Sequence, residues 1–166
     1  MNRFTCKGLA LALCFATAPG LLATQAFAAT PASSSAESTE STAIQRAMKD
    51  IWDKPDSRLE VAPVSILGSH AVAGWIQGSR GGRALLKRNA HGQWTVAACG
   101  GDGLKDPKML EMAGLSATAA SQLAWNVAQA EAAMTPKQRA LFSSFDGMVQ
   151  MDPHGAHPAH STGNTH

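Results

Sequence analysis

The pattern of apolar and polar residues predicts one helix, then four strands, then further helices. Between Ala43 and Trp52, apolar residues recur three and four positions apart, which places them on one face of an α-helix. Pro55 and its polar neighbours end this helix. Upstream, residues 29–42 are rich in Ser, Thr, Ala and Glu and have no apolar period, so we expect a disordered spacer there.

Four short apolar runs follow, separated by turns that contain glycine. They predict strands over residues 59–67, 71–77, 83–88 and 93–99. Residues 78–82, with the sequence GSRGG, predict a loop in which several residues adopt positive φ. Such short connections favour antiparallel neighbours and therefore a meander, and the proline in the first run indicates an edge strand.

The C-terminal half contains three predicted helix starts. Asp106-Pro107 and Thr135-Pro136 each join a capping residue to a proline in the first turn, and Ser116 caps a longer helix between them. We expect helices over 108–113, 117–134 and 137–145. The fold class is therefore α+β: an N-terminal helix, a four-stranded antiparallel meander and two to three C-terminal helices in one domain over 43–147, as in cystatin-like or NTF2-like domains.

Residues 1–28 have the features of a secretory signal peptide. Arg3 and Lys7 provide a positive start, a mostly apolar stretch follows, and Ala26-Phe27-Ala28 fits a cleavage site before Ala29. The apolar stretch is interrupted and too short to span a bilayer comfortably. We therefore expect an exported protein with no transmembrane segment after cleavage.

Cleavage changes the charge and the cysteine count. It removes two of the 14 basic residues and none of the 12 acidic ones, which leaves a mature chain of zero formal net charge. The composition therefore gives no reason to expect nucleic acid as a partner. Of the three cysteines only Cys99 remains, so no intramolecular disulfide forms, and the thiol is buried, metal-bound or paired with another molecule.

The segment 148–166 predicts a flexible tail rich in Met and His. Four of the six histidines lie in the last 13 positions, and His154, His157 and His160 follow one another at intervals of three residues. Imidazole suits Cu(II) and Zn, whereas methionine and cysteine sulfur suit Cu(I). The candidate metal ligands are Met148, Met151, His154, His157, His160 and Cys99. They predict copper as the bound metal, with zinc bound non-specifically; the alternatives are a solvated tail and a buried, inert Cys99.

The sequence contains no recognisable catalytic motif. There is no H-E-x-x-H, no nucleophile elbow, no phosphate-binding loop and no obvious pair of acids. Arg80 and Arg83 flank two glycines, where they either receive an anion or are solvated hairpin charges. We therefore expect a protein that is not an enzyme.

Three segments carry a resemblance to a known family. The segments 71–86, 94–102 and 145–151, which include AVAGWIQGSRGGRALL and CGGD, resemble the copper uptake system-associated proteins, a family of small exported bacterial proteins. The resemblance covers residues 44–152 and the His-rich ending. It implies a periplasmic accessory factor linked to copper acquisition, which docks on a membrane copper-uptake component and is not a known enzyme. It assigns no ligands, so the copper ligands above rest on ligand chemistry.

A second function class fits the same elements. A helix packed on a curved meander often encloses an apolar pocket, which predicts a small-molecule-binding module with an incidental tail. Such a pocket is expected to be lined by Trp52, Trp75 or Trp94.

Overall fold

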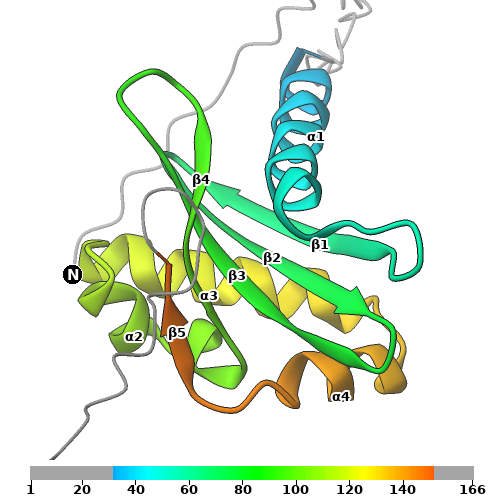
Figure 1. Ribbon diagram of the computed structural model, residues 1–166. Coiled ribbons are helices and arrows are strands. Elements are labelled where there is room, and N and C mark those ends of the chain that lie inside the picture. Colours follow the sequence, from blue (N-terminus) through cyan, green and yellow to red (C-terminus); the bar gives the residue numbers. More distant parts are fainter. Residues whose placement is uncertain (1–31, 152–166) are drawn as a thin grey trace, which may run out of the picture. The chain divides into compact units, whose positions relative to one another are not determined.

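The computed structural model describes residues 32–151, and their elements confirm the α+β class (Figure 1). The signal peptide and most of the predicted tail lie outside these residues. Within them, no helix is long and apolar enough to cross a membrane. In chain order the elements are α1 Ala32–Trp52, β1 Leu59–Leu67, β2 His70–Gln77, β3 Arg80–Arg88, β4 Trp94–Gly100, the 3-10 helix η1 Asp102–Lys105, α2 Pro107–Met112, α3 Ala117–Ala132, α4 Pro136–Ser143 and β5 Met148–Gln150.

The strands form one antiparallel sheet in the order β1-β2-β3-β4-β5. The first four strands pair with their sequential neighbours through short turns, as the meander prediction requires, and β1 lies at an edge. The fifth strand pairs with β4 after the intervening helices. The register aligns Ala73 with Ala84 and Ala84 with Cys99, so these three residues form a row across β2, β3 and β4. This row lies on the side of the sheet that α1 covers.

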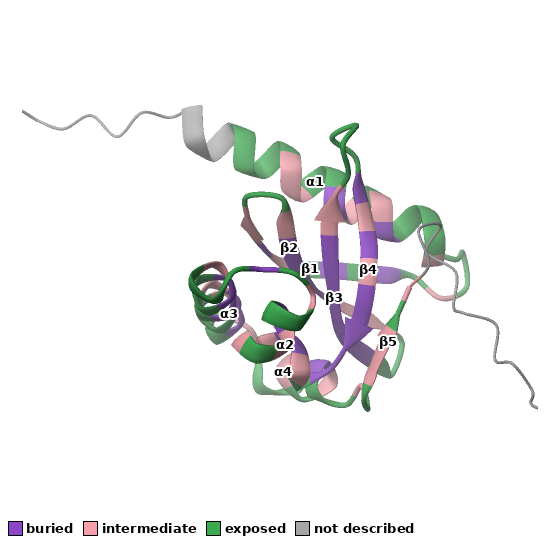
Figure 2. Ribbon diagram, turned by 90° about the vertical axis from the view of Figure 1, so that its left-hand side faces the viewer, coloured by how far each residue is buried: buried purple, intermediate pink, exposed green. Residues whose placement is uncertain are grey.

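The two faces of the sheet carry separate apolar clusters (Figure 2). On the face towards α1, here called the α1 face, Ala84 and Leu86 pack with Ile44 and Met48 of the helix. On the other face, here called the α3 face, Leu85 packs with residues of α2 and α3. Adjacent strand residues point to opposite faces, which is why consecutive positions such as 84, 85 and 86 are all buried. Burying each leucine contributes about 2 kcal/mol.

The helix starts of the C-terminal half are confirmed by their capping hydrogen bonds. Asp106 accepts a hydrogen bond from the backbone N–H of Lys108, and Ser116 accepts one from that of Ala119. Thr135 forms a capping box with Gln138. These local signals were sufficient because each cap satisfies a backbone donor within its own first turn.

Helix α1 is longer than the apolar pattern predicts. It begins at Ala32 and includes residues 32–42, which we expected to be a disordered spacer. This stretch contains no glycine or proline, and Glu40 forms an ion pair with Arg88 of β3. Once the apolar face has fixed the C-terminal part of the helix, further turns add hydrogen bonds at little cost because no helix-breaking residue interrupts them. The ion pair between Glu40 and Arg88 adds a contact between this extension and the sheet.

Two further expectations about the strands are wrong. Residues 80–82 belong to β3 and not to a loop, and of the glycines in that segment only Gly78, with φ of 63°, has positive φ. Met148–Gln150 forms β5 on the edge of β4 and is not part of a flexible tail. The folded domain therefore extends beyond residue 147 and includes β5, which ends at Gln150.

Arg83 lies at the centre of a buried ion pair. Its side chain is 1% exposed, and its Nε and Nη2 donate to the two carboxylate oxygens of Glu131 at 2.6 and 2.7 Å. It also donates to Asp102 and to the carbonyl oxygen of Phe142, each at 3.2 Å. Arg83 is therefore not a solvated hairpin charge. The anion it receives comes from α3 of the same chain.

Candidate functional site

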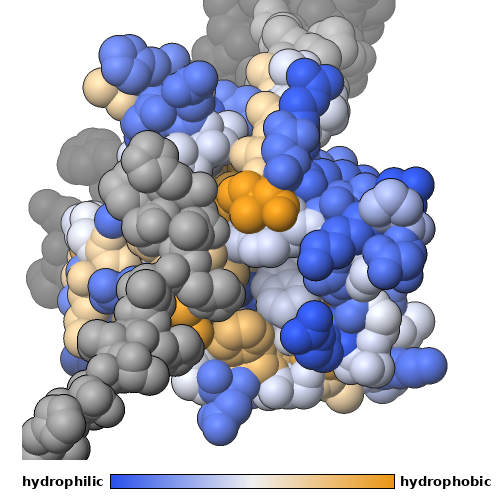
Figure 3. Space-filling view, in the orientation of Figure 1, coloured by the Kyte–Doolittle hydropathy of each residue, from blue (hydrophilic) through white to orange (hydrophobic). Residues whose placement is uncertain are grey.

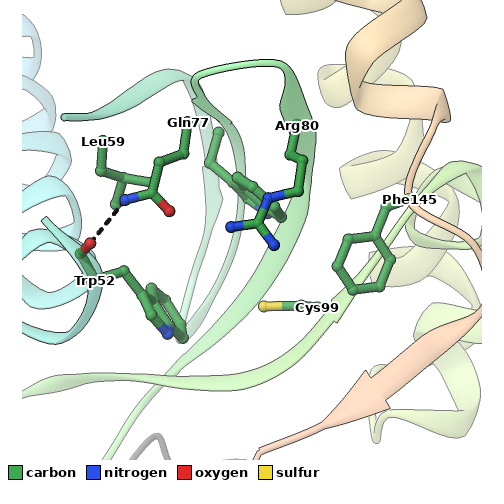
Figure 4. Close-up of a pocket in the computed structure, with 7 residues that line it drawn as sticks. Trp52, Leu59, Gln77, Arg80, Cys99 and Phe145 are labelled. Carbon is green, nitrogen blue, oxygen red and sulfur yellow. Dashed lines mark hydrogen bonds between the residues drawn. The ribbon is translucent and has the colours of Figure 1, made fainter. Parts of the chain in front are cut away.

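A cavity of about 160 Å³ opens on the α1 face, beyond the C-terminal end of α1 (Figure 4). Its lining residues come from the end of α1, from four strands and from the segment between α4 and β5. They are Trp52, Leu59, Trp75, Gln77, Arg80, Cys99 and Phe145. The strand residues in this lining point to the α1 face, the side of the sheet that also carries Ala73, Ala84 and Cys99. Figure 3 views the molecule in the orientation of Figure 1 and shows apolar and neutral residues gathered below α1, with hydrophilic ones around them.

The mouth of the cavity is held by hydrogen bonds to the loop after α1. Gln77 Nε2 donates to the carbonyl oxygens of Trp52 and Ser57, both at 2.8 Å. Asp53 accepts a hydrogen bond from the backbone N–H of Leu59 at 2.7 Å and pairs with Arg58. The hydrogen bond from Leu59 lowers the pKa of Asp53, with help from Arg58. These contacts fix the end of α1 against β1 and β2 and so fix the position of Trp52.

The opposite wall is a pair of aromatic rings. Trp75 and Phe145 meet edge to face with centroids 5.9 Å apart and an interplanar angle of 81°. Two glycines allow this approach: a Cβ at Gly82 would lie 2.9 Å from the Trp75 ring, and one at Gly101 would lie 2.3 Å from the carbonyl oxygen of Phe145. The indole N–H of Trp75 is buried without a hydrogen-bond partner among the described residues, and such a donor marks a place where an acceptor is expected.

Cys99 lies at the floor of the cavity as a free thiol. Its side chain is buried, and this burial raises its pKa to about 11. The thiolate is the form that attacks electrophiles and binds metals, so the thiol at neutral pH is the less reactive form. Its buried position therefore favours a packing role for Cys99 over a role as a nucleophile or metal ligand.

The two candidate methionines lie on opposite faces of the sheet. Met148 packs against the cluster on the α3 face, and Met151 packs against the α1-face cluster that contains Cys99. While β5 is paired with β4, Met148 and Met151 therefore do not share one metal ion. His154, His157 and His160 lie outside the described residues. Within residues 32–151, no group of three or more His, Cys, Asp and Glu side chains is arranged to hold a metal.

Two lining residues, Gln77 and Phe145, carry no sequence signal of their own and look like ordinary polar and core positions. For Arg80 the sequence left open an anion site or a solvated charge, and the structure places it at the cavity. Trp52 and Trp75 line the cavity, whereas Trp94 is buried under the guanidinium of Arg88, 4.7 Å from its ring centre. The closest available signal is the glycine pattern, because glycines in the middle and at the end of strands indicate close approach of another segment.

Comparison of the chain with protein-family models, with curated proteins and with solved structures finds no match.

Proposed function

We propose that this protein is an exported, periplasmic copper-binding accessory protein that is not an enzyme. The observation that carries the proposal is the set of three histidines at positions 154, 157 and 160, which begins three residues after Met151. Imidazole and thioether together suit copper in both oxidation states, and zinc binds to the same imidazoles with less selectivity. The resemblance to the copper uptake system-associated proteins supports the same function, with a membrane copper-uptake component as the partner.

The fold supports this proposal by anchoring the start of the tail. The backbone N–H of Met151 donates to the carbonyl oxygen of Ala97 at 2.9 Å, and the Met151 side chain packs on the α1 face. Three residues of chain span at most about 11 Å, so His154 stays near Met151 whatever conformation the chain takes. The thioether and the first imidazole are therefore close enough along the chain to bind the same ion.

The same geometry narrows the proposed ligand set. Met148 points to the other face of the sheet, and Cys99 is a buried thiol with a raised pKa. Binding copper through either residue requires β5 to detach or the thiol to lose its proton inside an apolar site. We therefore propose Met151, His154, His157 and His160 as the copper ligands.

The test is a copper titration of the mature chain from Ala29 and of a triple variant, His154→Ala/His157→Ala/His160→Ala. The full chain is expected to bind about one Cu(II) far more tightly than Zn²⁺ at neutral pH, and the triple variant to lose most of this affinity. Binding should weaken as the imidazoles become protonated near pH 6. The matched control is His70→Ala/His91→Ala, which removes two histidines of the folded domain.

A second substitution tests Met151 on its own. Met151→Leu keeps an apolar side chain on the α1 face, and we expect it to weaken Cu(I) binding under reductant more than Cu(II) binding. If the triple variant binds copper as the full chain does, the tail is not the site. A chain truncated at Gly147 is a poor substitute for these variants because it also removes β5 and exposes the edge of β4.

A second candidate function is the binding of a small molecule, and the cavity beside Trp52 and Trp75 favours it. Its volume of about 160 Å³ is close to that of an engineered cavity of about 150 Å³ that binds benzene. Ligand-observed NMR with single-ring aromatic compounds tests this function. A cavity-filling Cys99→Leu variant is expected to lose the signal, and equal signals from both proteins would exclude the cavity as the site.

A further inference from the structure

The cavity contains one charged side chain without a partner. Among the described residues, Arg58, Arg83 and Arg88 each form an ion pair, whereas the Arg80 side chain forms no ion pair and no hydrogen bond. Figure 4 shows the Arg80 guanidinium extending over the cavity, towards Cys99. A free guanidinium presents several N–H donors in a plane and matches a carboxylate with two parallel hydrogen bonds.

The rest of the wall is apolar and aromatic. Trp52 and Leu59 face the cavity from one side, and Phe145 faces it from the other. Trp75, which packs edge to face against Phe145, also lines it. Among the residues that the structure describes, no acidic side chain lines this cavity. A metal cation there would meet the positive charge of Arg80 and an uncharged thiol, whereas an aromatic ring would meet three aromatic side chains.

The size of the site limits the ligand. The cavity of about 160 Å³ fits one six-membered ring by the same comparison with benzene. A second hollow of about 250 Å³ lies beside it and shares Trp75, Arg80 and Phe145, which places Arg80 at the boundary between the two. A ring in the first hollow therefore leaves room for a charged substituent beside Arg80. Asp146 also lines this second hollow, and its carboxylate would repel an anion placed beside it.

We propose that this cavity binds a small aromatic monocarboxylate, with the ring against Trp52, Trp75 and Phe145 and the carboxylate on Arg80. This inference rests on the second candidate function and gives it a ligand class. The carboxylate supplies the anion that Arg80 lacks, and its desolvation is limited because Arg80 is exposed at the mouth. A doubly charged phosphate fits less well because the lining provides only one cation.

The test is calorimetric titration of the mature protein with benzoate and with benzyl alcohol, a neutral compound of similar size. For a ligand of this size we expect a Kd for benzoate of about 0.1–1 mM and at least tenfold weaker binding of benzyl alcohol. Arg80→Gln should weaken benzoate binding about tenfold and leave benzyl alcohol binding unchanged. Arg46→Gln, which removes an exposed arginine of α1 away from the cavity, is the matched control.

The outcomes separate the ligand class from the function itself. Equal affinity for benzoate and benzyl alcohol, or no effect of Arg80→Gln, would overturn the carboxylate inference and leave small-molecule binding in place. Binding of neither compound would overturn both. Benzoate binding that Cys99→Leu abolishes while its far-ultraviolet circular dichroism spectrum is preserved would support both, since the larger side chain fills the cavity.

Discussion

Replacement of Glu131 is the sharpest test of how this fold is held together. Arg83 is 0% exposed, and the Glu131 carboxylate accepts hydrogen bonds from two of its N–H groups, at 2.6 and 2.7 Å. In Glu131→Gln the amide replaces one acceptor oxygen with a donor, so a buried guanidinium N–H faces another donor. Breaking one side of a buried ion pair costs about 3–5 kcal/mol.

The remaining partners of Arg83 do not compensate for this loss. Asp102 lies 3.2 Å away and its side chain is 60% exposed, so its attraction is screened by water. The carbonyl oxygen of Phe142, also at 3.2 Å, is neutral. At about 4 °C per kcal/mol for a domain of this size, Glu131→Gln should lower the melting temperature by about 12–20 °C.

The assay is chemical and thermal unfolding of three variants beside the unmodified protein. Glu40→Gln is the control because it breaks the partly exposed pair with Arg88, where we expect a loss below about 1 kcal/mol. Arg83→Met/Glu131→Leu removes both charges and should be more stable than Glu131→Gln alone, because no unpaired charge stays buried. The reasoning is refuted if Glu131→Gln costs no more than Glu40→Gln.

Three further predictions concern the cavity and its supports. Because its pKa is raised to about 11 from an ordinary value of 9.0, Cys99 should react with a disulfide reagent about a hundredfold more slowly in the folded protein than in guanidinium chloride; equal rates would contradict its burial. Gly101→Ala should destabilise the domain by about 1–3 kcal/mol in urea, because its Cβ meets the Phe145 carbonyl at 2.3 Å, whereas Gly103→Ala, with its nearest atom at 3.7 Å, should be nearly neutral. The pKa of Asp53 is lowered in the folded protein, so the ionised carboxylate stabilises the fold above about pH 4, and this stabilisation is lost as the pH falls through the lowered pKa. When the free energy of unfolding is measured as a function of pH, Asp53→Asn should lose less stability on acidification than the unmodified protein.

Local patterns predicted much of the fold. The caps at Asp106, Ser116 and Thr135 lie within one turn of the groups they bind. In the four predicted strands, the alternation of residues along each strand decides which face of the sheet each side chain occupies. These features depend only on neighbours in sequence. The same reasoning missed β5, because Met148–Gln150 is too short to show a period, and its strand conformation comes from pairing with β4.

The candidate site was harder to predict because its contacts are distant in sequence. Arg83 looks like a hairpin charge until Glu131, 48 residues later, is placed beside it. Arg80 resembles Arg83 in sequence, yet it lies on the other face of the sheet and has no partner among the described residues. Two arginines separated by two glycines thus have opposite environments, and only the register of β3 decides which one is available to a ligand.

That register also explains why both proposed functions use the α1 face. On the α3 face, Arg83, Phe142 and the residues of α2 and α3 fill the sheet surface, and Gly74 and Gly81 let α4 pack directly on the backbone. On the α1 face, the helix ends at Trp52, and the sheet surface beyond it carries residues that line the cavity. Met151 packs against the same α1-face cluster. If copper binding changes the packing of Met151 and this change alters the affinity of the cavity for its ligand, reciprocity requires that the ligand alter the copper affinity by the same factor.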